Sequence, residues 1–442
     1  MASSNITFSE YNETGPALLT AGGSSGSSGS SSHKIQATFR VAPIHVTVAN
    51  TLRRQILAAV PTVGFKTEPP ESSDVFISAN TTPLVNEMLI HRIGMIPIAV
   101  TDPATFNPED YEFRLNIENV SKGLVNVTAS DFVVVKTATP DQPESTMDTK
   151  QFFPPDPITG ETPLITVLRP RYNMDSPAEK LLIRAKASIG TGRDNMRYSS
   201  VAQCSYEYTL DQDTSRQNSR FTTWLATSKK VPDTTAIPPE RLQELRREFD
   251  CLEIQRCYLQ NEKGEPYDFV FHIESVGVFS VPTIIERGLA ACEDLVTPYT
   301  SLDVDLTDNI SVGTPANRMA QDDSGAVFDF TFRKEEHTLG NLLQTFLVER
   351  HIEGTELPRL KYAGYRVPHP LKQEMVLTIC PVEGDVMNVR RALANVCKYL
   401  KEYFAEARKT WLLTPKGGLA PVEQATAPAP APKTRGRTKA PL

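Results

Sequence analysis

Two side chains at helical spacing, Glu87 and His91, are the nearest that the chain comes to a metal-binding pair. Positions i and i+4 lie on one face of a helix, so a carboxylate and an imidazole placed there could share a metal ion. A zinc site needs three or four ligands, and no third candidate stands nearby in the sequence. We therefore expect no metal ion at this pair.

The cysteines do not form a metal-binding pattern either. A structural zinc site typically has two pairs of cysteines, each pair closely spaced. Only Cys251 and Cys257 stand close together, and no second pair accompanies them. Free cysteine favours protein interiors, so we predict reduced and mostly buried thiols. The six cysteines are Cys204, Cys251, Cys257, Cys292, Cys380 and Cys397.

No catalytic motif is present. The sequence lacks a phosphate-binding P-loop, HExxH and any NADFDGD-type run of metal-binding carboxylates. An enzyme in its own right remains one interpretation for a chain of this length, but these absences disfavour it.

Composition narrows the class of protein further. The chain has 442 residues, of which 40% are hydrophobic and 22% charged, as in an ordinary globular protein with two or three domains. No stretch approaches the roughly 18 to 20 consecutive apolar residues of a membrane span, and the N-terminus does not resemble a secretory signal. The net charge is −7, so the chain as a whole is acidic and not basic. We expect contact with DNA or RNA only indirectly, through partners.

Composition also divides the chain. A Gly/Ser run precedes the first apolar pattern, an acidic segment with five aspartates interrupts the chain after residue 300, and a basic Pro/Ala-rich segment ends it. For the last segment, nucleic-acid contact through residues 433–439 is a weaker interpretation than a solubilising tail. The predicted division is a flexible tail over 1–33, a first domain over 34–62 and 190–300, a β-rich insertion domain over 63–189, an acidic linker over 301–325, a second domain over 326–412 and a disordered tail over 413–442.

The first domain combines strands with apolar helices. Lys34–Val41 alternates as a half-buried strand does, and a helix follows in which Val48, Leu52, Ile56 and Val60 form one apolar stripe, with Arg53 and Arg54 off it. A second helix is expected from Thr82-Pro83 to Gly94. Further strands are expected near 203–210 and 267–279, and a helix after Pro282 places Ile285, Leu289 and Cys292 on one face.

The second domain repeats this order. A strand over 327–335 is followed by a helix with Leu339, Leu342, Leu343, Phe346 and Leu347 on one side, two more strands, and a long helix from about Asp385 to Trp411. The apolar helices of each copy can cover one face of its sheet, and their remaining apolar surface must pack against another element. The predicted fold is α+β, with two dimerisation modules of antiparallel sheet and helices that pair as an intramolecular pseudo-dimer.

These segments resemble a known family. Residues 48–62 and 80–98 resemble the opening of the α-like subunits of multisubunit DNA-directed RNA polymerases, namely the third-largest subunit of RNA polymerase II and the archaeal D subunit. Residues 268–289 resemble its closing strand and helix. Residues 332–347 and 362–379 resemble the smaller partner, the eleventh subunit of RNA polymerase II or archaeal L.

The resemblance implies a fusion of two subunits that are separate chains in cells, joined through residues 301–325. Such a fusion is similar to those of large nucleocytoplasmic DNA viruses, so a viral polymerase is the expected source. Linking turns a bimolecular association into an intramolecular one. The implied role is a non-catalytic platform that binds the second-largest and then the largest polymerase subunit.

The resemblance also assigns residues. Asn50, Thr51, Leu52, Arg53 and Arg54 match the helix that faces the large subunits, although a solvated helix face is the simpler interpretation without the family. Asn86, Glu87, His91 and Arg92 match a second partner-facing motif. In the second domain the matching motif is assigned to intramolecular dimerisation, with Thr338 as helix N-cap. Its residues are His337, Thr338, Leu339, Asn341, Leu342, Leu343 and Phe346.

One departure concerns metals. Many relatives carry a cysteine cluster in the insertion domain that binds zinc or an iron–sulfur centre, but no cysteine lies between residues 35 and 203. We expect no cofactor in this chain, with magnesium and zinc only in partner subunits, and an insertion domain held by its own core. The expected partners are the two large subunits and small zinc-bearing subunits, with one copy of this chain per polymerase and no membrane.

The expected location is the virion and the cytoplasmic viral factory, with the host nucleus as the alternative. A virion structural or interaction protein that keeps the pseudo-dimer without polymerase assembly remains the rival interpretation.

Overall fold

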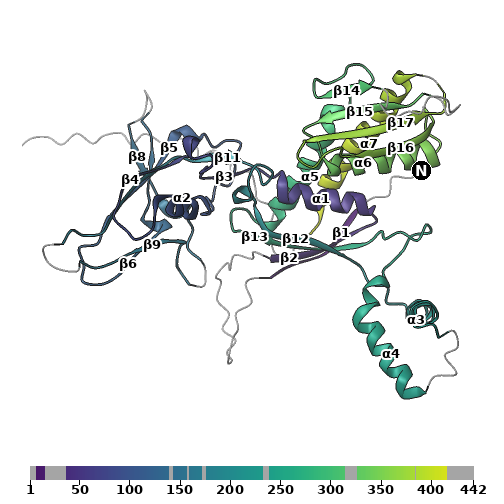
Figure 1. The fold of residues 1–442 in the computed structure, drawn as a ribbon, viewed down its shortest axis with the longest axis horizontal. Helices are drawn as coiled ribbons and strands as arrows, with labels where there is room; N and C mark the ends of the chain where they lie inside the picture. Colours follow the sequence, from purple (N-terminus) through teal and green to yellow (C-terminus); the bar gives the residue numbers. More distant parts are fainter. Residues whose placement is uncertain are drawn as a thin grey trace, which may run out of the picture.

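A computed structural model of the chain describes residues 6–14, 36–138, 143–156, 159–171, 176–231, 238–313, 326–383 and 385–415. Two sheet-and-helix modules stand side by side, and a β-rich domain and a pair of helices project from the first of them (Figure 1). Residues 1–5, 15–33 and 416–442 of the predicted tails, and residues 314–325 of the predicted linker, lie outside the described residues.

The two modules have the same sheet topology. Each sheet has four antiparallel strands, and in both the order across the sheet is first, second, fourth and third strand of the module. The first module has β1 (Thr7–Thr14), β2 (Gln36–Ala42), β13 (Phe269–Ser275) and β12 (Val201–Tyr208). The second has β14 (Ile310–Gly313), β15 (Phe328–Arg333), β17 (Glu374–Pro381) and β16 (Leu360–Arg366).

Each module places two helices against its sheet. The first module has α1 (Val46–Ala58) and α5 (Val281–Val296), and the second has α6 (His337–Leu347) and α7 (Val386–Leu413). The apolar stripes predicted for these helices are buried, including Leu52 and Ile56 on α1 and Leu393 and Leu400 on α7. Burial of these stripes is the main reason that the helices form where they do.

One continuous hydrophobic core unites the two modules. Phe39, Leu52 and Leu289 of the first module belong to the same cluster of buried side chains as Leu343 and Leu393 of the second. Helix α1 contacts α6, and α5 contacts α7. The predicted α+β fold with an intramolecular pseudo-dimer is therefore confirmed.

The N-terminal segment corrects one prediction. Residues 7–14, placed in a flexible tail, form strand β1, which pairs with β2. The side chains of Phe8 and Tyr11 lie at 5.2 and 5.6 Å, between ring centroids, from the indole of Trp411 on α7. The sequence signal was weak because only part of this short strand is apolar, and contact with α7 supplies the rest of its burial.

The linker prediction also needs correction. Residues 310–313 form β14, the edge strand of the second module, so the connection between modules spans only about residues 297–309. This connection is packed: Leu302 is buried, its carbonyl oxygen accepts a hydrogen bond from Arg390 Nε at 2.7 Å, and Asp303 pairs with Lys398 Nζ at 2.9 Å. One acidic residue of this segment, Asp303, therefore binds the second module, whereas Asp305 and Asp308 are exposed.

The insertion domain has its own core, as predicted. A cluster of phenylalanines including Phe65, Phe113, Phe132 and Phe153 lies between its strands. Its one α-helix in the described residues is α2 (Asn86–Gly94). Its strands are β3 (Thr62–Gly64), β4 (Val75–Asn80), β5 (Tyr111–Glu118), β6 (Val125–Thr128), β7 (Val133–Lys136), β8 (Ser145–Met147), β9 (Leu164–Leu168), β10 (Lys180–Ala185) and β11 (Ser188–Gly190).

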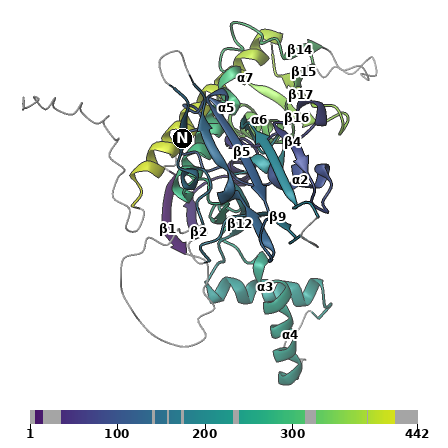
Figure 2. The ribbon, with the colours of Figure 1, turned by 90° about the vertical axis from the view of Figure 1, so that its left-hand side faces the viewer.

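A pair of helices between β12 and β13 was not predicted. Helices α3 (Thr214–Thr227) and α4 (Pro239–Leu252) project away from the modules (Figure 2). They bury Phe221 and Leu225 against Leu245 and Phe249. The i, i+4 spacing in both helices was the signal that could have found them.

Helix α6 continues into a π-helical turn, Val348–Glu353, that buries His351 completely. The Nδ1 atom of His351 lies 2.8 Å from the carbonyl oxygen of Pro358, so Nδ1 carries the proton and donates it there. Nε2 is buried and has no hydrogen-bond partner among the described residues. Burial lowers the pKa of His351 below its ordinary value, against smaller opposing effects from Pro358 and Glu356.

We predict that replacing Trp411 weakens the whole pseudo-dimer. Its indole is fully buried and donates a hydrogen bond to the carbonyl oxygen of Pro282 on α5 at 3.1 Å. Trp411→Ala should lower the free energy of unfolding by about 3–5 kcal/mol, measured by denaturant titration with circular dichroism. Leu413→Ala, at a side chain that is 83% exposed, is the control and should change it by less than about 0.5 kcal/mol.

We also predict that His351 makes stability fall in mild acid. The unfolded chain binds a proton at this histidine near pH 6.5, whereas the folded chain takes it up only at lower pH, so the free energy of unfolding falls as pH drops below about 6.5. His351→Asn can keep the bond to Pro358 but does not titrate. Its free energy of unfolding should therefore fall less between pH 7 and 5. An equally steep fall would contradict the assignment, and His369→Asn, at an exposed histidine, is the matched control.

Candidate partner-docking surface

The two family motifs meet where α1 crosses α6. When the sequences of α1 and α6 are aligned so that Asn50 corresponds to Asn341, Thr47 corresponds to Thr338 and Arg54 corresponds to Thr345. The Thr47 hydroxyl lies 3.2 Å from that of Thr345, and Arg54 Nε donates to the Thr338 hydroxyl at 2.6 Å. These two contacts are equivalent under the exchange of modules, as a two-fold interface requires.

Two of the predicted partner-facing residues on α1 point inward. Thr51 is buried and donates its hydroxyl to the carbonyl oxygen of Thr47 at 2.8 Å, and Leu52 lies in the shared core. Partner contact is therefore withdrawn for these two residues, because the apolar side of α1 must cover the sheet. Asn50, Arg53 and Arg54 are partly exposed.

Arg53 and Arg54 face different surroundings although they are adjacent. Arg54 contacts the second module, through Thr338 and through Glu336, whose carboxylate lies 3.8 Å away. Arg53 bonds instead to its own helix, with Nε and Nη2 at 3.1 and 3.0 Å from Asn50 Oδ1. Successive residues on a helix point about 100° apart, which explains the split. Partner contact thus remains a prediction for Arg53. The guanidinium of Arg54 instead contacts the second module of the same chain.

A groove lies beside Arg53. It has a volume of about 560 Å³ and is also lined by Asn50 and by Tyr206 and Tyr208 of β12. No carboxylate of the described residues forms an ion pair with Arg53. Burial raises the pKa of Cys204 to about 12 and also raises the pKa of Tyr206. The positive charge of Arg53 opposes both increases.

The motif on α6 is mostly structural. Leu339, Leu342, Leu343 and Phe346 are buried in the shared core, which is the dimerisation role expected of them. Thr338 is not the N-cap: α6 begins at His337 with Glu336 before it, and the Thr338 hydroxyl accepts from Arg54.

Two polar members of the α6 motif lie at the rim of the crossing. His337 is exposed, with Nδ1 at 3.3 Å from the hydroxyl of Tyr365. Asn341 lines a small cavity of about 80 Å³ at the crossing, together with Asn50.

The second partner-facing motif lies on α2 of the insertion domain. Asn86, Glu87, His91 and Arg92 are all exposed, and Arg92 Nη2 donates to the carbonyl oxygen of Leu164 at 2.9 Å. No group of three or more His, Cys, Asp or Glu side chains placed to hold a metal ion occurs in the described part of the chain.

The start of α2 differs from the prediction. The helix begins at Asn86 and not at Thr82-Pro83. The N–H and the hydroxyl of Thr82 both donate to Asn80 Oδ1, at 2.9 and 2.7 Å, which makes a turn before the helix.

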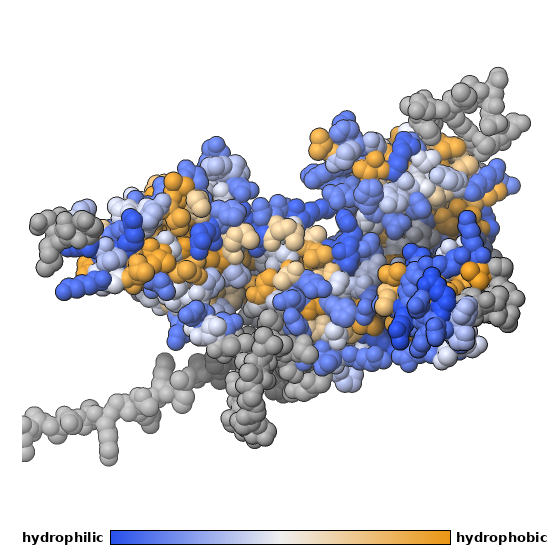
Figure 3. Space-filling model, turned by 60° about the horizontal axis from the view of Figure 1, so that its bottom comes forward, coloured by the Kyte–Doolittle hydropathy of each residue, from blue (hydrophilic) through white to orange (hydrophobic). Residues whose placement is uncertain are grey.

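Apolar side chains surround the polar ones on α2. Val85, Met88 and Met95 are 55%, 54% and 57% exposed. Hydrophobic residues also gather on the outside of the insertion domain in the space-filling view (Figure 3). An exposed apolar group with a polar rim is typical of a protein-binding surface.

Arg287 fixes the insertion domain to the first module. Its Nη2 donates to the carbonyl oxygen of Thr101 at 2.8 Å, and its guanidinium lies 4.2 Å from the ring centroid of Phe279. The N–H of Arg193 also donates to the carbonyl oxygen of Ala58 at the end of α1, at 2.9 Å. The exposed faces of α1 and α2 are therefore held in a defined relation.

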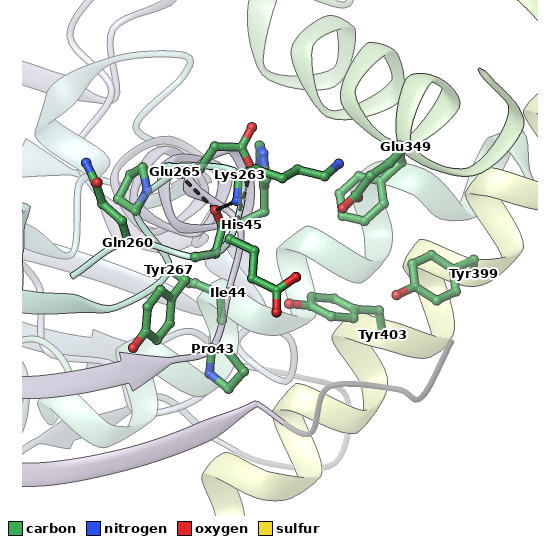
Figure 4. A pocket seen from close by; sticks show the side chains of 14 residues that line it. Pro43, Ile44, His45, Gln260, Lys263, Glu265, Tyr267, Glu349, Tyr399 and Tyr403 are labelled. Carbon is green, nitrogen blue, oxygen red and sulfur yellow. Dashed lines mark hydrogen bonds between the residues drawn. The ribbon is translucent and has the colours of Figure 1, made fainter. Parts of the chain in front are cut away.

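A second groove, of about 650 Å³, lies between the modules and was not predicted (Figure 4). Pro43, Ile44 and His45 line it from the first module, and Tyr399 and Tyr403 line it from α7. Burial raises the pKa of Tyr403 above its ordinary value, so the phenol stays protonated. The groove exists only because the modules pair, which is why the local sequence gave no sign of it.

The cysteines agree with the prediction of reduced, mostly buried thiols. All six are free, and five are buried, with Cys251 the exposed one. Burial raises the pKa of the Cys397 thiol to about 12. A protonated, enclosed thiol is a poor nucleophile.

We predict that reversing Arg54 weakens the pairing of the modules. Arg54→Glu places a carboxylate beside Glu336 and should lower the free energy of unfolding by about 1–2 kcal/mol in denaturant titration. Adding Glu336→Arg should restore part of the loss, and Arg53→Glu is the control, with a change below about 0.5 kcal/mol. An Arg54→Glu chain as stable as the native one would contradict the intramolecular role.

Comparison with known proteins identifies the two modules. The RNA polymerase Rpb3/Rpb11 dimerisation domain matches residues 38–296 and, in a second family description, residues 328–410. No helix of the described residues has both the length and the apolar character needed to cross a membrane.

Individual relatives each match a little more than half of this chain. Subunit rpac1 of DNA-directed RNA polymerases I and III from Dictyostelium discoideum is 28% identical over 275 residues, which are 57% of this chain and 74% of the relative. RPB3 of RNA polymerase II from Schizosaccharomyces pombe is 25% identical, over 56% of this chain and 76% of the relative. The archaeal subunit Rpo3 of Thermoplasma volcanium is 21% identical, over 57% and 89%. The chain belongs to the family of RNA polymerase α-like subunits built on the Rpb3/Rpb11 dimerisation domain.

Proposed function

We propose that this chain is the assembly platform of a multisubunit DNA-directed RNA polymerase, a fusion of an Rpb3-like and an Rpb11-like subunit that performs no catalysis itself. The observation that carries the proposal is the single core shared by two matched dimerisation domains. A preformed pair needs no association step before partners bind.

Two exposed surfaces support docking of larger partners. Arg53 has no carboxylate partner among the described residues, and α2 presents Arg92 among exposed apolar side chains. The partners proposed are the second-largest subunit, then the largest, together with small zinc-bearing subunits. Magnesium and zinc are proposed to reside in these partners, and the polymerase is proposed to contain one copy of this chain.

The source and location are proposed from the fusion alone. Both halves in one chain fit a large DNA virus, which would place the protein in virions and in the cytoplasmic viral factory, or alternatively in the host nucleus.

Purification of the tagged chain from cells that express it natively tests the proposal. We expect two very large polypeptides to co-elute, with template-dependent RNA synthesis in the eluate. A chain recovered alone, or with capsid proteins only, would favour the virion protein instead and overturn the polymerase role.

We predict that charge reversal on either surface reduces docking while leaving the fold intact. Arg53→Glu and Arg92→Glu should each lower recovery of the large subunits by about tenfold or more, measured by quantitative mass spectrometry. Arg247→Glu, at an exposed arginine of α4, is the matched control. Native recovery with both variants would show that these surfaces do not dock the partners.

A further inference from the structure

Strand β12 is an unpaired edge of the first sheet. Among the described residues it pairs with β13 and with no other named strand. It is eight residues long and contains no proline. Its one charged residue, Glu207, is matched by His272 of β13, with the two side chains 3.2 Å apart. Exposed edges in natural proteins are usually short, charged or covered, and β12 has little of this protection.

The direction of the backbone groups follows from the pairing with β13. The N–H of Thr209 donates to the carbonyl oxygen of Asp268 at 3.1 Å, so Thr209 faces β13. Backbone groups alternate in direction along an antiparallel strand, and the register is regular from Gln203 to Tyr208. The N–H and C=O groups of Tyr206 and Tyr208 therefore face the free edge.

The groove beside this edge has an apolar wall and a cation. Tyr206 and Tyr208 lie with ring centroids 6.4 Å apart, and Tyr258 continues the row at 4.9 Å from Tyr208. Arg53 lines the same groove, and among the described residues its side-chain hydrogen bonds go only to the neutral oxygen of Asn50. The groove thus offers backbone hydrogen bonds, apolar contact and the positive charge of Arg53, which forms no ion pair among the described residues. The carboxylate of Glu207 also lines the groove, and it lies beside His272.

We propose that the edge of β12 receives an extended segment of the polymerase subunit that docks on this chain, with an acidic side chain placed against Arg53. The segment pairs its backbone with Tyr206 and Tyr208 and continues the first sheet as a fifth strand. This inference rests on the proposed function, and it names the form and charge of the partner segment.

The second module contains an internal control. Strand β16 holds the equivalent edge position in the second sheet, and there the π-helical turn 348–353 of the same chain contacts it. Arg54 is replaced by Thr345 and Arg53 by Gln344 at the equivalent positions of α6. The two edges therefore share geometry but differ in charge and surroundings.

Hydrogen–deuterium exchange on the free chain and on the purified polymerase tests the pairing. We expect exchange in peptides covering 202–208 to slow at least tenfold in the complex, whereas peptides covering 360–366 keep their rate. Unchanged exchange at 202–208 in a complex that contains the large subunits would overturn the strand pairing and leave the proposed function standing. Failure of the large subunits to co-purify would overturn both.

Photo-crosslinking locates the partner segment. Gln203 and Glu207 are exposed, and they lie four positions apart along a regular stretch of β12. Crosslinking residues at positions 203 and 207 should react with one partner segment at sites four residues apart, because paired strands advance together. Crosslinks to unrelated segments would contradict strand addition.

The charge requirement is tested at Arg53. Arg53→Lys should keep recovery of the large subunits within about threefold of native, whereas Arg53→Gln should lower it about tenfold and reduce protection at 202–208. Equal recovery with lysine and glutamine would overturn the pairing with an acidic side chain.

Discussion

The structure depends on one constraint: the helices of each module have apolar surface that faces their own sheet and apolar surface that faces away from it, and both must be buried. Each module has helices that cover one sheet face and still expose apolar side chains, and a four-stranded sheet with two helices has no second layer to cover them. Packing α5 against α7 and α1 against α6 removes that surface from water for both modules at once. The close approach of α1 and α5 depends on Gly288, where an added Cβ would lie 2.4 Å from Ile56 Cγ1. Neither module has a complete core without the other.

The same constraint explains the chain segments that join and flank the modules. The connection after α5 could be a loose tether, yet Leu302 is buried and Tyr299 donates its hydroxyl to Glu335 of the second module at 3.1 Å. Strand β1 likewise covers Trp411 from the N-terminal side. Both segments add contacts across the pseudo-dimer, so joining the two domains does more than raise their effective concentration.

Much of the asymmetry lies in what is inserted between equivalent strands, and the rest lies in side chains such as Arg53 and in the π-helical turn after α6. The sheets share one topology, and the contacts of Thr47 with Thr345 and of Arg54 with Thr338 are related by exchange of the modules. Only the first module carries the insertion domain with α2, the pair α3 and α4, and an arginine at position 53 beside an open edge. The features suited to larger partners are therefore concentrated on one half of a nearly symmetric body. Symmetry serves stability here, and the recognition of partners is proposed for the half that carries the insertions.

The sequence by itself determined the α+β class, the repeated order of strands and helices, and the buried stripes of α1, α5, α6 and α7, because periodicity reports which side of an element is apolar. It also determined that the thiols are mostly buried. Only the tertiary structure decided that Arg54 binds Thr338 while Arg53 stays beside a groove, that Thr338 is no N-cap, and that Thr51 and Leu52 face inward. It likewise decided that residues 7–14 and 310–313 are edge strands, since short strands with little apolar pattern form only when a neighbouring strand supplies their hydrogen bonds. The physical reason is common to all of these: local pattern fixes an element and its apolar face, but the partner of a polar side chain is set by which distant segment the folded core brings beside it.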